Sequence, residues 1–194
     1  MARKATLQRK TRETNITLTL DFDATGGAIN TPVGFFNHML ESFAKHSGWC
    51  LTIEAAGDTH VDDHHTVEDV GICLGLALKQ AIGEKQGMAR FGSATIPMDE
   101  ALAEAVVDFG GRGYCVVNGL PREGTIGTFA VELTHEFFQA LAMSAEMNLH
   151  LNVRYGSNRH HIVEAAFKAL AHACRQAVMV RAGSSEILST KGTL

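Results

Sequence analysis

Residues 64–68 read His-His-Thr-Val-Glu, and residues 160–164 read His-His-Ile-Val-Glu. The likeness extends beyond these pentapeptides. At a spacing of 96 residues, segments 64–82 and 160–178 share both histidines, Val, Glu, Leu, Ala, Gln and Ala, which is eight identities over 19 positions. Self-similarity at a fixed spacing is typical of a duplicated supersecondary unit. The sequence therefore predicts two related halves, each with a histidine pair and a glutamate.

The predicted elements follow the same order in both halves. Alternating apolar and polar residues predict strands, and apolar residues three and four apart predict helices. The first half has a strand over 14–20, a helix over 38–45, a strand over 50–55 and a helix over 64–83; the second half has the same elements over 101–107, 135–147, 148–153 and 160–181. Capping residues, Asp62-Asp63 and Ser157-Asn158, precede the histidine pairs, which places the histidines in a first helical turn.

Sheets and helices that each carry one apolar face are best covered as two layers. We therefore expect an α/β fold of the α+β two-layer sandwich type, in which each half is a mixed sheet packed against two helices. The first half-domain would span residues 1–96 with an N-terminal arm, and the second residues 97–194 with a C-terminal flap, together forming one compact domain. Gly71, Gly75 and Gly83 indicate either close helix packing or a weakened helix.

The composition is that of an ordinary water-soluble globular protein. Hydrophobic residues make up 45% of the 194 residues, and no apolar stretch reaches the roughly 20 residues of a membrane span. The net charge of −4 argues against nucleic acid as a partner, and the basic stretch 1–12 is predicted to be a solvated arm. The four cysteines are scattered and are expected to be reduced, which fits a cytoplasmic location.

The repeated histidines and glutamates have the spacing of metal ligands. Residues i and i+4 share one helix face, so His64 can converge with Glu68, and His160 with Glu164. The adjacent histidines point about 100° away around the helix and are expected to face a different site. This geometry predicts two metal sites rather than one.

A third histidine is also duplicated, because a one-residue adjustment of the repeat brings His38 opposite His135. We hypothesise that one metal takes His64 and Glu68 together with His161 of the other repeat. The second metal takes His160 and Glu164 together with His65, and His38 and His135 complete the two sets. Nitrogen-rich sites with a carboxylate and no thiolate suit Mn, Fe, Zn or Ni.

The remaining histidines have no duplicated partner. His60, His150 and His172 are therefore expected to be structural. His46 lies two helical turns after His38, and either a place in the same cleft or a structural role fits it. Two other functions remain open at this stage: a dinuclear metallohydrolase and a metal-binding storage or sensing assembly.

Five stretches are similar to one known family: residues 63–72, 74–78 and 156–168, Asn37-His38-Met39-Leu40, and Ser189-Thr190-Lys191-Gly192. They resemble the imidazoleglycerol-phosphate dehydratases of histidine biosynthesis over nearly the whole chain. The resemblance implies a duplicated α/β fold and a homo-oligomer of 24 subunits with active sites between chains. It also implies a metal-dependent carbon–oxygen lyase that converts imidazoleglycerol phosphate to imidazole acetol phosphate and water.

The resemblance also implies roles for individual residues. Two Mn²⁺ ions per active site would be bound by His38, His64, His65, Glu68, His135, His160, His161 and Glu164. Catalytic roles are implied for Glu13, His46, Glu68 and Glu164. Substrate and phosphate contacts are implied for Glu13, His38, His46, Arg90, Arg112, Lys168, Ser189, Thr190 and Lys191. We expect the phosphate-binding residues and the metal ligands to share one cleft.

Overall fold

The structure, a computed structural model, describes residues 3–181, 183 and 185–192. The first half contains β1 (Lys4–Lys10), β2 (Thr14–Asp21), β3 (Ile29–Asn30), α1 (Gly34–Ser47), β4 (Cys50–Gly57) and α2 (His64–Ile82). The second half contains β5 (Phe91–Met98), β6 (Ala101–Asp108), β7 (Tyr114–Asn118), β8 (Thr125–Ile126), β9 (Phe129–Ala130), α3 (Leu133–Ser144), β10 (Asn148–Tyr155) and α4 (Arg159–Ala177).

The two halves have the same topology. One four-stranded sheet has the order β1-β2-β4-β3, and the other has the order β5-β6-β10-β7. In each sheet the first three strands are antiparallel and the edge strand, β3 or β7, runs parallel to its neighbour. The predicted duplicated α+β fold with mixed sheets is therefore confirmed.

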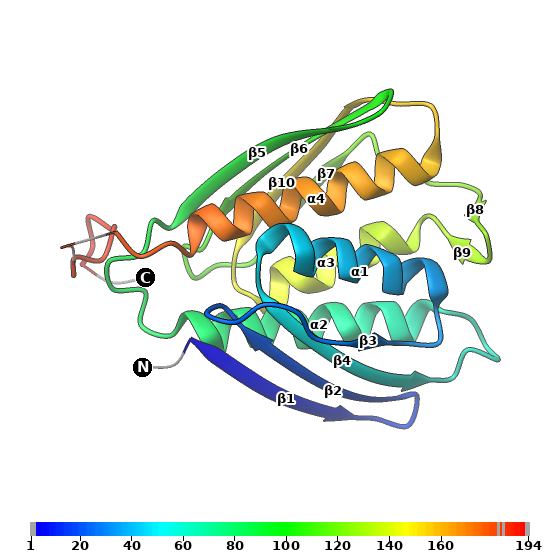
Figure 1. The fold of residues 1–194 in the computed structure, drawn as a ribbon, viewed down its shortest axis with the longest axis horizontal. Helices are drawn as coiled ribbons and strands as arrows, with labels where there is room; N and C mark the ends of the chain where they lie inside the picture. The colour runs from blue at the N-terminus through cyan, green and yellow to red at the C-terminus, as the bar shows by residue number, and fades with distance from the viewer. Residues whose placement is uncertain (1–2, 182, 184, 193–194) are drawn as a thin grey trace.

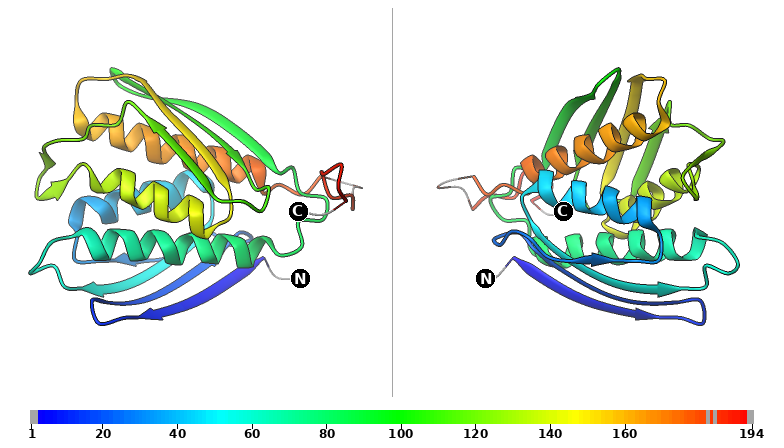
Figure 2. Two further views of the ribbon diagram at one scale, coloured as in Figure 1. Left: turned by 180° about the vertical axis from the view of Figure 1, so that it is seen from behind. Right: turned by 45° about the vertical axis from the view of Figure 1, so that its right-hand side comes forward.

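The helices lie between the two sheets (Figures 1 and 2). Helix α2 packs on β1 and β2, and α4 packs on β5 and β6. The halves meet through their helices, because α2 packs against α3 and α1 against α4. Aromatic side chains fill this interior: Phe36, Phe43, Phe137, Phe138 and Phe167 are almost fully buried. Removing such side chains from water is the main favourable contribution to folding.

Six strands were missed in the sequence: β1, β3, β5, β7, β8 and β9. The stretch predicted as a solvated basic arm contains β1, which pairs with β2 over seven residues. Its alternation directs Ala5 and Leu7 toward the core while Lys4 and Lys10 face outward, and the basic character of the stretch masks this alternation. Strand β5 pairs with β6, and the predicted boundary between residues 96 and 97 lies inside it. The division into half-domains at that position stays a prediction.

The spacing of the repeat changes along the chain because the second half carries an insertion. Glu13 and Glu100 directly precede β2 and β6 and lie 87 residues apart, whereas His64 and His160 lie 96 residues apart. The nine additional residues of the second half therefore lie between Glu100 and His160. The small β8–β9 hairpin is in this stretch and has no counterpart in the first half.

The predicted helices are present with shifted ends. Helix α1 begins four residues before His38, and α3 ends at Ser144 rather than at residue 147. Helix α4 ends at Ala177 rather than at residue 181. All four helices begin at the same end of the molecule, which is the right-hand end in Figure 1. No helix among the described residues is long and apolar enough to cross a membrane.

Candidate functional site

The two histidine pairs lie where the sequence predicts them, in the first turns of α2 and α4. A helix leaves its first backbone N–H groups without partners, and a preceding polar side chain can accept from them. Asp62 Oδ1 accepts from the backbone N–H of His64 at 2.8 Å, and Asn158 Oδ1 accepts from that of His160 at 2.9 Å. The equivalent bonds hold both pairs in equivalent positions.

In the second half, three predicted ligands converge. Glu164 Oε2 lies 3.1 Å from His160 Nε2, as expected for residues i and i+4, and 3.7 Å from His38 Nε2 of α1. Ligand atoms of these three residues all lie within 4.8 Å of one another, which is close enough for one metal ion. The packing of α1 against α4 brings His38 to this place. Two imidazoles and one carboxylate suit a divalent transition metal.

Lys168 lies beside this cluster, one turn after Glu164. Its ammonium group is 2.8 Å from Glu164 Oε1, as helix geometry allows for residues i and i+4. Glu164 is 7% exposed, and this burial opposes its ionisation. The nearby Lys168, His38 and His160 outweigh the burial, so the pKa of Glu164 is lowered from its ordinary value. The carboxylate is thus ionised and able to bind a cation.

The first half is more open at the corresponding place. His64 Nε2 and Glu68 Oε2 are 3.9 Å apart, and both side chains are more than two-fifths exposed. His135 instead contacts the neighbouring Glu136 at 3.4 Å. Among the described residues, the His38 cluster is the one group of this kind that is close enough for a metal. The expected set of three histidines and one carboxylate is therefore not assembled within a single chain.

The second histidine of each pair turns away from the first. The rings of His64 and His65 are 6.1 Å apart at an interplanar angle of 86°, and those of His160 and His161 are 6.1 Å apart at 78°. This confirms the predicted divergence of adjacent histidines. It also means that the expected contribution of His65 and His161 to the opposite repeat's cluster is not made within one chain.

Carboxylates surround His65 in the first half. Its Nδ1 lies 3.1 Å from each carboxylate oxygen of Asp58, and its Nε2 lies 3.8 Å from Glu13. The hydrogen bond to Asp58 raises the pKa of His65, with a smaller contribution from Glu13. Glu13, predicted to act in catalysis, lies in the β1–β2 turn with its side chain 52% exposed.

His161 has a similar environment in the second half. Its Nδ1 lies 2.6 Å from Glu100 Oε2, and its Nε2 lies 3.7 Å from Asp99. The hydrogen bond to Glu100 raises the pKa of His161. In turn, His161 and the backbone N–H groups of Asn158 and Ser157 lower the pKa of Glu100 to about 2. The sequence analysis assigned no chemistry to Asp58, Asp99 or Glu100; the position of Glu100 directly before β6, like Glu13 before β2, was the available signal.

His46 contacts a second histidine between α1 and α4. Its Nδ1 lies 3.3 Å from His172 Nε2. Partial burial lowers the pKa of His46, and the positive charge of Lys168 adds to the effect. His46 is therefore a neutral imidazole at neutral pH, able to accept or donate a hydrogen bond. His172, expected to be structural, is its partner.

Five predicted phosphate-binding residues gather around one pocket of about 720 Å³: Arg90, Arg112, Ser189, Thr190 and Lys191. Arg90 is held in place by Asp108, which lies 2.6 Å and 3.0 Å from two of its guanidinium nitrogens, and it donates to the carbonyl of Leu188. Guanidinium, ammonium and hydroxyl groups together are typical of a phosphate site. The two glycines 110 and 111 line the same pocket, which leaves the backbone accessible.

The pocket lined by Arg90 and Arg112 and the cluster of His38, His160 and Glu164 lie at opposite ends of α4. Arg90 donates its backbone N–H to the carbonyl of Ala177, the last residue of α4, whereas His160 is the second residue. At 1.5 Å per residue, His160 and Ala177 are roughly 25 Å apart along the helix axis. One small molecule cannot reach both groups within a chain. Within one chain, the predicted phosphate-binding residues and the predicted metal ligands therefore do not share a cleft.

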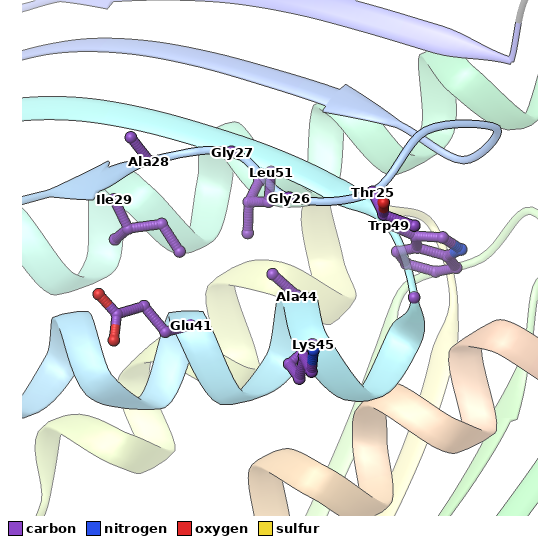
Figure 3. Close-up of a pocket in the computed structure, with 11 residues that line it drawn as sticks. Thr25, Gly26, Gly27, Ala28, Ile29, Glu41, Ala44, Lys45, Trp49 and Leu51 are labelled. Carbon is purple, nitrogen blue, oxygen red and sulfur yellow. The ribbon is translucent and has the colours of Figure 1, made fainter.

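A separate pocket of about 540 Å³ lies between α1 and the segment 25–29 (Figure 3). Glu41, Ala44 and Lys45 of α1 line one side, and Leu51 lies between the helix and the segment. None of the predicted site residues lines this pocket. The candidate site is therefore the histidine-rich end of the helices together with the pocket at their other end.

Comparisons with known proteins agree over the whole chain. Residues 31–174 match the family profile of imidazoleglycerol-phosphate dehydratase. Proteins of that name from Geobacillus kaustophilus and Geobacter sulfurreducens are 51% and 52% identical over 195 residues, covering 100% of both chains in each case. The crystal structure of imidazoleglycerol-phosphate dehydratase from Staphylococcus aureus is 40% identical, with a TM-score of 0.84 over 92% of this chain and 99% of that one.

Proposed function

The chain belongs to the imidazoleglycerol-phosphate dehydratase family of histidine-biosynthesis enzymes, and on this premise we propose that its reaction depends on two bound metal ions. The observation that carries the proposal is the convergence of His38, His160 and Glu164 on one point. A buried carboxylate beside two accessible imidazoles has the donor set of a divalent transition metal with open positions. We take Mn²⁺ as the metal, on the family resemblance.

A second site is proposed in the first half by the internal repeat. Helix α2 packs against α3 as α4 packs against α1. His64, Glu68 and His135 are therefore the counterparts of His160, Glu164 and His38. His65 and His161 lie at the same end of the molecule and complete the two sets from neighbouring subunits. The metals would stabilise the negative charge that develops on the imidazole ring of the substrate when the neighbouring C–H bond breaks.

The chain's own residues would hold the substrate and move protons. Glu13 lies beside a predicted ligand, His65, and is exposed, so it is the proposed group that removes or returns a proton. His46 and Lys168, on the facing sides of α1 and α4, would contact the polar chain of the substrate. Arg90, Arg112 and the hydroxyl and ammonium groups of residues 189–191 would bind its phosphate. The proposed closing of residues 189–192 over substrate, as a C-terminal flap, stays a prediction.

The separation of the two binding regions supports an active site shared between subunits. Since about 25 Å of helix α4 separates the metal ligands from the phosphate pocket, one substrate requires the two regions from different chains. We therefore propose a homo-oligomer, with 24 subunits as the family resemblance implies. A cytoplasmic location is proposed with it, in keeping with four free cysteines.

Co-assembly of two inactive variants tests the shared site. Glu164→Gln removes a metal ligand and Arg112→Ala removes a phosphate contact, so each variant alone should be nearly inactive at a substrate concentration well below the raised KM of the Arg112 variant. When the two are expressed together, some sites draw both intact regions from different chains, and part of the activity should return. Activity no higher than that of the separate variants in verified mixed oligomers would refute a site shared between subunits.

Metal removal tests the metal dependence directly. Chelator-treated enzyme should lose turnover of imidazoleglycerol phosphate and regain it on addition of Mn²⁺, with metal content measured in parallel. Undiminished turnover by metal-free protein would refute the proposal. Glu13→Gln should lower kcat and leave the metal content unchanged; an unchanged kcat would remove Glu13 from the mechanism.

A further inference from the structure

The hydrogen bond between His161 and Glu100 fixes which ring nitrogen carries the hydrogen. His161 Nδ1 lies 2.6 Å from Glu100 Oε2. An ionised carboxylate can only accept hydrogen bonds, so Nδ1 must be the donor. In the neutral ring the lone pair is then on Nε2. That nitrogen faces away from Glu100 and toward Asp99, at 3.7 Å.

The other oxygen of Glu100 is also fully used. Glu100 Oε1 accepts from the backbone N–H of Ser157 at 3.1 Å, from its hydroxyl at 3.2 Å, and from the backbone N–H of Asn158 at 2.7 Å. These residues directly precede α4, which carries His161. Because both oxygens are engaged, the carboxylate cannot rotate without losing bonds on one side. It connects the β5–β6 turn to the start of α4.

We infer that Glu100 is a positioning residue, which holds His161 in the tautomer and orientation that present Nε2 to a divalent metal ion. The inference rests on the proposed function, because it concerns the metal sites proposed above. Outer carboxylates of this kind orient metal-bound histidines and increase their basicity, and their loss weakens metal binding by about 10- to 100-fold.

Asp58 holds His65 in the same way but with less constraint. Both of its oxygens lie 3.1 Å from His65 Nδ1, and its side chain makes no further hydrogen bond with the described residues. An asparagine at position 58 could therefore turn its carbonyl oxygen toward Nδ1–H and preserve the tautomer. The two positions thus predict different responses to the same change from carboxylate to amide.

A glutamine at position 100 has no such freedom. Its carbonyl oxygen is needed by the N–H groups of Ser157 and Asn158, so its NH₂ group must face His161 Nδ1. That nitrogen would then have to accept a hydrogen bond, and the hydrogen of the neutral ring would move to Nε2. The lone pair that binds the metal would be lost. Glu100→Ala, by contrast, leaves His161 free to choose either tautomer.

Calorimetric titration of metal-stripped protein with Mn²⁺ tests the inference. E100Q should weaken binding by about 10- to 100-fold, and by more than E100A does. D58N and the control E104Q, whose carboxylate pairs with Arg154 on the same sheet, should change binding by no more than a few fold. If Glu100 only supported the start of α4, alanine would be the more damaging replacement, because it removes every acceptor.

Binding by E100Q within about twofold of the wild type, or weaker binding by E100A than by E100Q, would overturn the inference. A readout independent of variants is the nitrogen NMR spectrum of histidine-labelled wild-type protein, metal-free, at a pH above the histidine range. His161, assigned by its loss in H161N, should carry its hydrogen on Nδ1; a hydrogen on Nε2 would also overturn the inference. Wild-type protein that binds no Mn²⁺ would instead refute the proposed metal dependence.

Discussion

Gly75 allows α2 to approach α3 closely, and adding one methyl group there should destabilise the protein. A Cβ atom at this position would lie 2.6 Å from the carbonyl oxygen of Leu141, 2.7 Å from Ser144 Cβ and 2.9 Å from the backbone nitrogen of Ala145. Two of these atoms belong to the backbone of α3 and its end, so they cannot move aside without shifting the helix. Overpacking of this kind costs about 1–3 kcal/mol. Alanine recovers about 1 kcal/mol of helix propensity.

The net result for Gly75→Ala is a loss of about 1–2 kcal/mol, since three close contacts place the cost in the upper part of that range. For a chain of this size, each 1 kcal/mol lowers Tm by about 2–4 °C. Differential scanning calorimetry of wild type and variant measures the shift. Binding at the first-half metal site, between α2 and α3, should weaken as well.

Gly34→Ala is the matched control, because Gly34 begins α1 and a Cβ there meets nothing within 4 Å. This variant should keep or slightly raise Tm. If Gly75→Ala melted at or above the wild-type temperature while Gly34→Ala behaved as expected, the argument that Gly75 is required for close helix packing would be refuted.

Three further results are expected. Asp69→Ala removes the buried carboxylate that pairs with Arg9 at 2.9 Å, so it should lower the free energy of unfolding by about 1–3 kcal/mol, measurable by urea denaturation; no change would contradict this. Arg112→Ala should raise KM about 10- to 100-fold with unchanged metal content, as expected for a lost charged hydrogen bond to phosphate. His65 and His161 have raised pKa values, so their pairs stabilise metal-free protein at acid pH, and this stabilisation is lost as pH rises through those values. Since metal displaces the same protons, Mn²⁺ affinity should fall as pH falls through that range, and a pH-independent affinity would contradict the assignment of these ligands.

The helices and the positions of the proposed metal ligands on them could be predicted because the signals are local. The i, i+4 spacing of His160 and Glu164 and the capping role of Asn158 depend on helix geometry alone, and the distances agree with both expectations. Close packing was likewise expected at Gly71 and Gly75 and is present at both. Gly83 differs: it follows α2 with φ of +63° and has open space around it, so it ends the helix rather than packing against a neighbour.

The parts that the sequence did not predict depend on distant segments. Strand β1 is stable as a strand because β2 supplies its hydrogen bonds, and nothing within residues 4–10 reveals that partner. In the same way, helical spacing places Lys168 beside Glu164 but carries no information about Arg90, which the sheet brings to the far end of α4. For this reason the sequence does not reveal that the cleft expected for these residues cannot form within one chain.

Glu13 and Glu100 occupy equivalent positions in the two halves, and their different surroundings explain how a duplicated fold can support an asymmetric reaction. Each directly precedes the second strand of its sheet and approaches the second histidine of a pair. Both oxygens of Glu100 accept hydrogen bonds. These bonds lower the pKa of Glu100 to about 2 and keep it from accepting a proton near neutral pH. Glu13 lies farther from its histidine because Asp58 already holds that ring, and it remains exposed. Dehydration needs a carboxylate that can exchange a proton, whereas a metal-binding histidine needs a neighbouring carboxylate that stays fixed. Under the proposed function, the additional carboxylate of Asp58 is therefore what leaves Glu13 available for proton transfer.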